Sequence, residues 1–222
     1  MNLSLNTYRQ EPQSKTAHYA VVLLHGYGSH GQDLISLAPH WQKILPETLF
    51  LSPDAPEPLD MMPGMGGFQW FSLANRDPQT YLEGARRAAP ILDQYIDEIL
   101  EQTGLSAEKL AIVGFSQGTM MALQVGLRRK DRIAGILGYS GALIDTEGLD
   151  AQVRGSEEWK PPVHLIHGDA DEVVSIESYY AAQEVLRQNN YPMSGHVTPA
   201  LGHGIDNDGI ESGAQFLNKI LK

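Results

Sequence analysis

The residues with the clearest capacity for chemistry lie in KLAIVGFSQGTMMAL, residues 109–123, where Ser116 stands between Gly114 and Gly118. The apolar residues before the serine predict a strand and those after it predict a helix, which is the context of a G-x-S-x-G nucleophile elbow. A serine at such a bend adopts a strained backbone conformation, and glycine two positions away on either side avoids collisions with the adjoining strand and helix. The alternative is a glycine-rich turn in which the serine is incidental. Because a serine hydroxyl is inert near neutral pH without a base, the decision depends on its partners.

A base is expected beyond the serine, because elbow hydrolases of this kind carry serine, acid and histidine in that order. His203 lies in LGHGID, a glycine-flanked loop between the last predicted strand and the last predicted helix, from which it can reach the elbow. The other histidines beyond Ser116 are His164, His167 and His196. They fall within or at the ends of predicted strands, which favours structural roles. His203 is therefore the predicted base.

The acid is expected in HGDADEVVS, which follows a predicted strand and offers Asp169, Asp171 and Glu172. A carboxylate there would hold the histidine tautomer through Nδ1–H and stabilise the imidazolium that forms. Spacing alone does not choose among the three, and at least one of the two aspartates is expected only to cap a turn.

Acyl transfer also requires donors aimed at the developing oxyanion. The backbone N–H of Gln117, directly after the serine, is one predicted donor. The glycine-rich stretch LLHGYGSHG, residues 23–31, follows an early strand and supplies the N–H of Tyr27 as the second. An ordinary strand exit is the alternative for His25 and Gly26. Both segments are expected at the carboxyl edge of a parallel sheet.

The elements that position these residues alternate between apolar strands and helical patterns, which predicts a mostly parallel, doubly wound α/β sheet flanked by helices in a single domain, residues 1–222. Residues 1–17 form an N-terminal segment and a candidate edge strand, while residues 53–77 and 144–161 are excursion loops near the expected site. The predicted strands cover residues 18–24, 48–56, 109–115, 132–141, 162–168 and 195–201, and the predicted helices cover residues 33–44, 81–104, 117–130, 177–188 and 209–221.

Composition excludes several classes of protein. The chain has 222 residues, 42% of them hydrophobic, which is enough for a core, and its net charge of -11 disfavours nucleic acid and anionic membranes as partners. The absence of cysteine removes disulfides, thiolate zinc sites and a cysteine nucleophile. No H-E-x-x-H cluster is present, so no metal or other cofactor is predicted. Without a signal-like segment or an apolar run of about 18 residues, a cytoplasmic location without stable membrane insertion is expected.

Taken together, these motifs resemble the acyl-protein thioesterase / carboxylesterase–phospholipase family of α/β hydrolases. The resemblance covers residues 19–221 and rests on LLHGYG, PDAP, QWF, GFSQG, HGDADEVV and GHG, all in the family's order. The family's acid is the fifth residue of an H-G-x-x-D pattern, so the resemblance implies Asp171. The chain departs from the family at Tyr27, Ser72 and Thr119, where members generally carry leucine, aspartate and glycine; these positions surround the expected acyl pocket.

The resulting hypothesis is a serine hydrolase that cleaves carboxylic esters or thioesters of small molecules through an acyl-enzyme, using Ser116, Asp171 and His203. The predicted substrate-binding residues are Met61, Met62, Met65, Trp70 and Phe71. The methionines could form an apolar lip for an acyl chain, or equally pack beneath their own loop. A non-catalytic small-molecule sensor and a small serine peptidase are the competing hypotheses. The sequence leaves the oligomeric state open, a homodimer included.

Overall fold

A seven-stranded sheet in the order β1-β3-β2-β6-β7-β8-β9 forms the centre of the computed structural model, which describes residues 1–60, 64, 66–75, 77–147, 149 and 159–222. Only β1, at one edge, runs antiparallel to its neighbour β3. The strands are β1 (Thr7–Gln10), β2 (Tyr19–Leu24), β3 (Thr48–Pro53), β6 (Leu110–Phe115), β7 (Gly135–Tyr139), β8 (Val163–Gly168) and β9 (Met193–Thr198). The mostly parallel sheet predicted from the alternation of elements is confirmed.

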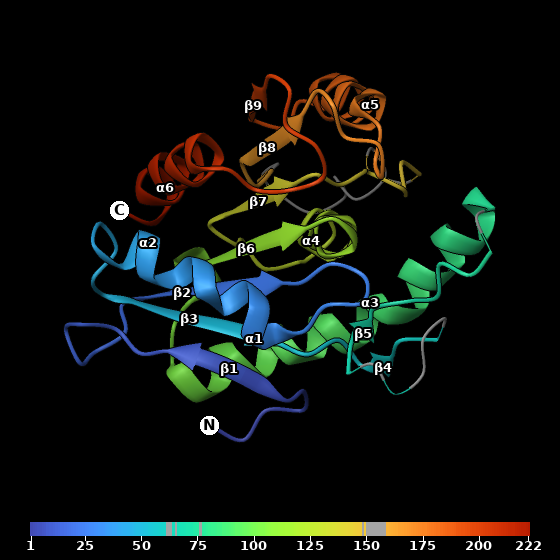
Figure 1. The fold of residues 1–222 in the computed structure, drawn as a ribbon. Coiled ribbons are helices and arrows are strands. Elements are labelled where there is room, and N and C mark those ends of the chain that lie inside the picture. The colour runs from blue at the N-terminus through green and yellow to red at the C-terminus, as the bar shows by residue number, and fades with distance from the viewer. Residues whose placement is uncertain (61–63, 65, 76, 148, 150–158) are drawn as a thin grey trace.

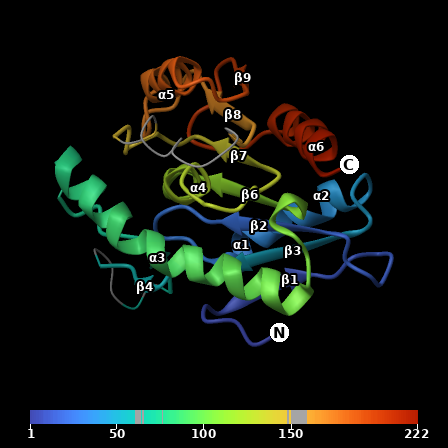
Figure 2. The same cartoon turned by 180° about the vertical axis from the view of Figure 1, so that it is seen from behind.

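Helices cover both faces of this sheet (Figures 1 and 2). One face carries α1 (Gly31–Leu34), the 3-10 turn η1 (Ile35–Leu37), α2 (Ala38–Gln42) and α6 (Asn207–Leu221). The other carries α3 (Pro78–Thr103), the 3-10 turn η2 (Ala107–Lys109), α4 (Gln117–Gly126) and α5 (Ile176–Gln188).

Strand β2 shows why the central strands read as continuous apolar runs. Val21 packs in the layer that contains Trp41 of α2, whereas Val22 packs in the layer that contains Leu123 of α4. Because successive side chains point to opposite faces and both faces are covered, every position in the strand must be apolar. This arrangement produces two core layers, one on each side of the sheet.

The segment between β3 and α3 contains a second, two-stranded antiparallel sheet, β4 (Glu57–Pro58) and β5 (Phe68–Gln69). Phe68 pairs its backbone with the loop that follows β2, accepting from Gly28 N at 2.9 Å and donating to Ser29 O at 2.8 Å. The segment is therefore fastened to the loop that carries Tyr27. Met61, Met62 and Met65 lie outside the described residues, as does most of the second predicted excursion.

Within the described ranges, no helix has the length and apolar character needed to cross a membrane.

Candidate active site

Ser116 lies at the junction between β6 and α4, with φ 54° and ψ -117°. Positive φ is uncommon for a residue other than glycine and carries conformational strain. The neighbouring structure holds the bend: Ser116 N donates to Tyr139 O of β7 at 2.9 Å, and Ser116 O accepts from Thr119 N at 2.9 Å. The junction thus has the strained turn expected of an elbow.

Both glycines of the pentapeptide are required by backbone contacts. A Cβ on Gly114 would lie 2.4 Å from backbone atoms of Gly118, at the start of α4. A Cβ on Gly118 would lie 1.8 Å from Leu24 O, at the end of β2. Neither contact can be relieved by turning a side chain, so the helix approaches the two strands this closely only with glycine at these positions.

His203 and Asp171 meet at the carboxyl edge of the sheet. His203 Nδ1 lies 2.8 Å from Asp171 Oδ2, and Asp171 Oδ1 accepts from the backbone N–H groups of Val173 and Val174, each at 2.9 Å. Burial alone raises the pKa of the Asp171 carboxyl, but the hydrogen bonds from His203 and the two amides outweigh it, so this pKa is lowered. Asp171 is therefore ionised near neutral pH, and its charge favours a proton on Nδ1 of His203.

Asp169 has a different environment. Its Oδ1 accepts from Ala200 N at 2.6 Å, and Ala200 has φ 57°. The backbone of the same segment pairs with the loop that carries His203, because Ala170 N donates to Leu201 O at 3.0 Å. Asp169 thus holds the turn that leads to His203, while Asp171 contacts the imidazole.

The imidazole of His203 lies beside the elbow. Its ring centroid is 4.9 Å from that of Phe115, the residue directly before Ser116. Among the described residues no hydrogen bond joins the Ser116 hydroxyl to His203; the contact between the two segments runs through Phe115.

The loop after β2 packs against the same elbow. A Cβ on Gly26 would lie 3.2 Å from the Cβ of Ser116, and Gly28 adopts φ 79°. The phenol of Tyr27 donates to Asp60 Oδ1 at 2.6 Å, which connects this loop to the segment that follows β3. Tyr27 and Gln117, the two residues predicted to supply oxyanion donors, therefore lie on adjacent segments around Ser116.

Trp70 and Phe71 are buried, with 1% and 2% of their surfaces exposed. Their backbone contacts the side chain of Gln117, which accepts from Trp70 N at 2.9 Å and donates to Phe71 O at 2.7 Å. Sequence reasoning considered only the backbone of Gln117 and missed this clamp. No sequence signal joins residues almost fifty positions apart, and their contact with substrate stays a prediction.

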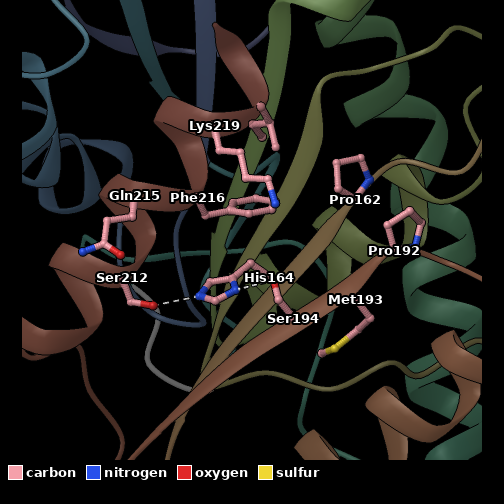
Figure 3. A pocket seen from close by; sticks show the side chains of 10 residues that line it. Pro162, His164, Pro192, Met193, Ser194, Ser212, Gln215, Phe216 and Lys219 are labelled. Atoms are coloured by element: carbon pink, nitrogen blue, oxygen red, sulfur yellow. Dashed lines mark hydrogen bonds between the residues drawn. The ribbon is translucent and has the colours of Figure 1, made fainter.

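A cavity of about 410 Å³ lies elsewhere, at the amino end of β8, between β9 and α6 (Figure 3). His164 lines it and bonds through Nδ1 to Ser194 Oγ at 2.7 Å and through Nε2 to Ser212 Oγ at 2.9 Å. Its ring stacks on Phe216 with centroids 5.2 Å apart. Burial, with His196 nearby, lowers the pKa of His164 to about 4, so this imidazole is neutral at pH 7. These contacts describe a packed structural histidine.

No group of three or more histidine or carboxylate side chains in the described part of the chain is arranged to hold a metal ion. The site consists of a strained serine and a histidine–carboxylate pair, and the loop after β2 packs beside the serine.

A parallel sheet in which a strand-to-helix turn presents a strained serine is the architecture of the α/β hydrolases. Comparison with known proteins agrees: residues 7–221 match the family described as phospholipase/carboxylesterase, and the chain belongs to that family. It is a hydrolase of the carboxylesterase and thioesterase type.

Individual relatives cover most of the chain. Acyl-protein thioesterase 1 of Gibberella zeae is 27% identical over 90% of each chain. Esterase YpfH of Escherichia coli is 28% identical over 89% of this chain and 81% of its own. The crystal structure of esterase PE8 superposes with a TM-score of 0.90 at 38% identity, covering 98% of this chain and 99% of that one. The family resemblance and the α/β-hydrolase fold expected from the motifs are thereby confirmed.

Proposed function

We propose that the protein hydrolyses carboxylic esters or thioesters of small molecules through an acyl-enzyme on Ser116, with His203 as general base and Asp171 as the residue that orients it. The observation that carries the proposal is the 2.8 Å contact between His203 Nδ1 and Asp171 Oδ2, made by a histidine packed against the residue next to Ser116. The order serine, acid, histidine along the chain agrees with it.

The reaction has two halves. Because Nδ1–H of His203 donates to Asp171, Nε2 is left to accept the Ser116 proton as the serine oxygen attacks the substrate carbonyl. His203 then donates this proton to the departing oxygen or sulfur, the bond from the acyl carbon to that atom breaks, and an acyl ester remains on Ser116. A water molecule, deprotonated in turn by His203, attacks the acyl carbon. The bond from that carbon to Ser116 Oγ then breaks, His203 returns the proton to Oγ, and the carboxylic acid is released.

Three groups prepare the site for this chemistry. The lowered pKa of Asp171 keeps the carboxylate charged when His203 becomes an imidazolium. The backbone N–H groups of Gln117 and Tyr27 are the proposed donors to the oxyanion, each worth about 3 kcal/mol in the transition state. Catalytic hydrogen bonds are often long in a ligand-free site and shorten once substrate binds. We therefore expect the contact between Ser116 and His203 to form in the complex.

We expect the choice of substrate to depend on loop positions at which the chain departs from the family, such as Tyr27 and Ser72. Relatives named as esterases and as acyl-protein thioesterases indicate ester or thioester substrates, including acylated ones. The acyl lip of Met61, Met62 and Met65 stays a prediction, as do a homodimer and a cytoplasmic location.

The test is turnover of p-nitrophenyl esters of increasing chain length by wild type, Ser116→Ala and Ser194→Ala. Ser194 contacts His164 at the distant cavity, so its variant is the matched control. We expect the Ser116 variant to lose at least about 10⁴-fold in kcat and the control to stay within about twofold. A fluorophosphonate should label wild type but not Ser116→Ala.

Other outcomes identify the competing functions. If the wild-type protein binds esters but neither hydrolyses them nor reacts with the fluorophosphonate, it is a small-molecule sensor. Cleavage of aryl amides as fast as activated esters would identify a peptidase. Full activity in Ser116→Ala would exclude the proposed nucleophile.

A further inference from the structure

Trp70 contacts both segments that carry the proposed oxyanion donors, the start of α4 and the loop after β2. Its backbone N–H donates to Oε1 of Gln117 at 2.9 Å, and its indole Nε1–H donates to the carbonyl oxygen of His25 at 3.1 Å. The residue has only 1% of its surface exposed. A single buried residue therefore connects the start of α4, through its backbone N–H, with the loop after β2, through its indole.

The contact with α4 is specific in both directions. Gln117 is fully buried, and its amide accepts from Trp70 N while it donates to Phe71 O at 2.7 Å. With both ends of the amide engaged, the side chain has one orientation. Gln117 is also the first residue of α4, so the position of its own backbone N–H is tied to residues 70–71.

The contact with the loop after β2 reaches the other donor through His25. His25 Nε2 accepts from Ala55 N at 2.9 Å, so the ring proton lies on Nδ1, which donates to Gly26 O at 2.7 Å. Burial lowers the pKa of His25, so the ring is neutral and keeps this tautomer. The Gly26 carbonyl and the Tyr27 N–H belong to one peptide plane, so a bond to the carbonyl on one side directs the N–H to the other.

Two consecutive peptides of this loop are thus fixed from the protein interior. The indole of Trp70 holds the His25 carbonyl, and the His25 ring holds the Gly26 carbonyl. The rings of His25 and Trp70 also lie against each other, with centroids 5.9 Å apart. Trp70 therefore constrains where the Tyr27 N–H stands relative to Gln117.

We propose that Trp70 is a positioning residue that sets the separation of the two oxyanion donors, because its backbone N–H holds the side chain of Gln117 and its indole N–H holds the carbonyl of His25. The inference rests on the proposed function, in which the N–H groups of Tyr27 and Gln117 stabilise the oxyanion. Such donors act only when preorganised at the position of the transition-state oxygen, so releasing the His25 carbonyl should weaken transition-state binding more than substrate binding.

The test is Trp70→Phe, which keeps a buried aromatic ring and removes the indole N–H. Its matched control is Trp41→Phe. Trp41 is also fully buried and donates from Nε1 to a backbone carbonyl, that of Ile210, at 3.1 Å, but it lies in the opposite core layer. The two variants lose the same kind of ring and the same kind of hydrogen bond, so a general effect of core disruption appears in both.

For Trp70→Phe we expect kcat to fall by at least about tenfold with KM within about twofold, because the lost interaction acts in the transition state. The affinity for a trifluoromethyl ketone, whose adduct with serine carries an oxyanion, should fall by the same factor as kcat/KM. The Trp41→Phe variant should stay within about twofold of wild type in kcat, in KM and in its affinity for the trifluoromethyl ketone.

Equal effects in the two variants would overturn the proposal, and so would a rise in KM alone, which would instead make Trp70 a substrate contact. Gln117→Met keeps the backbone N–H and removes the clamp, and it should reproduce the loss in kcat if Trp70→Phe does not fold; unchanged kcat in that variant also overturns the proposal. Failure of the proposed function is recognised separately, by full activity in Ser116→Ala.

Discussion

Asp171 gives one carboxylate oxygen to His203 Nδ1, at 2.8 Å, and the other to two successive backbone N–H groups, those of Val173 and Val174. The carboxylate is thereby fixed by its own loop before it contacts the imidazole. Asp169, two residues earlier, instead accepts from Ala200 N and holds the turn that leads to His203. The two aspartates of one short loop have separate partners, which makes their roles separable by mutation.

Asp171→Asn should lower kcat by roughly 10³- to 10⁴-fold, because an amide can present its N–H to Nδ1 and thereby favours the wrong tautomer of His203. Asp169→Asn keeps an acceptor for Ala200 N and should lower kcat by less than about tenfold. Steady-state kinetics on a p-nitrophenyl ester measure both. A larger loss in the Asp169 variant would refute the assignment of Asp171.

Gly118→Ala should destabilise the fold strongly, because the new Cβ would stand 1.8 Å from Leu24 O and no side chain can move to relieve the contact. We expect a loss of about 3 kcal/mol or more in the free energy of unfolding, or a Tm lower by about 6–12 °C. Thermal unfolding followed by circular dichroism measures it. Gly204→Ala is the control, since its Cβ would meet nothing within 4 Å; equal shifts in Tm would contradict the steric account.

His164 should make stability depend on pH. Burial lowers its pKa to about 4 in the folded state, from the ordinary histidine value of about 6.5. Between these values the unfolded chain binds a proton that the folded protein excludes, so the free energy of unfolding decreases as the pH falls from about 6.5 towards about 4. The slope from this group is at most about 1.4 kcal/mol per pH unit.

The test for His164 is urea unfolding of wild type and His164→Gln at several pH values across that window. The variant should show a flatter dependence, whereas His18→Gln should not, because the His18 side chain is 56% exposed. Parallel curves for wild type and His164→Gln would show that this histidine does not carry the dependence.

Asp145 anchors the segment that follows β7. Its carboxylate, with 3% of the side chain exposed, bonds to Arg86 Nε at 2.9 Å and Nη2 at 3.0 Å, and Arg128 Nη2 lies 3.3 Å away. Asp145→Ala would remove the carboxylate beside the largely buried guanidinium of Arg128. We expect the free energy of unfolding to fall by about 2 kcal/mol, a figure that allows for the exposure of Arg86 to solvent. Urea unfolding measures this loss. Glu147→Ala is the control, because the Glu147 side chain also contacts Arg86 but is 79% exposed. This variant should change the free energy of unfolding by less than about 0.5 kcal/mol. Equal effects would contradict the role given to burial.

Much of the fold follows from local pattern alone. The runs at β2, β6 and β8 are apolar at nearly every position because both faces of the sheet are covered, and that pattern indicates parallel strands without knowledge of their neighbours. The elbow is equally local, because its glycines and the strand and helix that flank it lie within seventeen residues, 110–126. Boundaries were less accurate: the strand expected over residues 132–141 is β7, Gly135–Tyr139, and α3 begins at Pro78 behind its cap, Asp77.

Only the tertiary structure determines the contacts between loops that are distant in sequence. The spacing in HGDADEVVS leaves several carboxylates as candidates for the acid. Which of them contacts His203 depends on the tertiary structure, in which Asp169 holds the turn at Ala200 and Asp171 contacts the imidazole. The clamp between Gln117 and residues 70–71 has no signature in either segment, since its hydrogen bonds depend on how the sheet brings the two together. The physical reason is the same in both cases: periodicity and sterics act within a few residues, whereas the direction of a loop side chain depends on the packing of the whole chain around it.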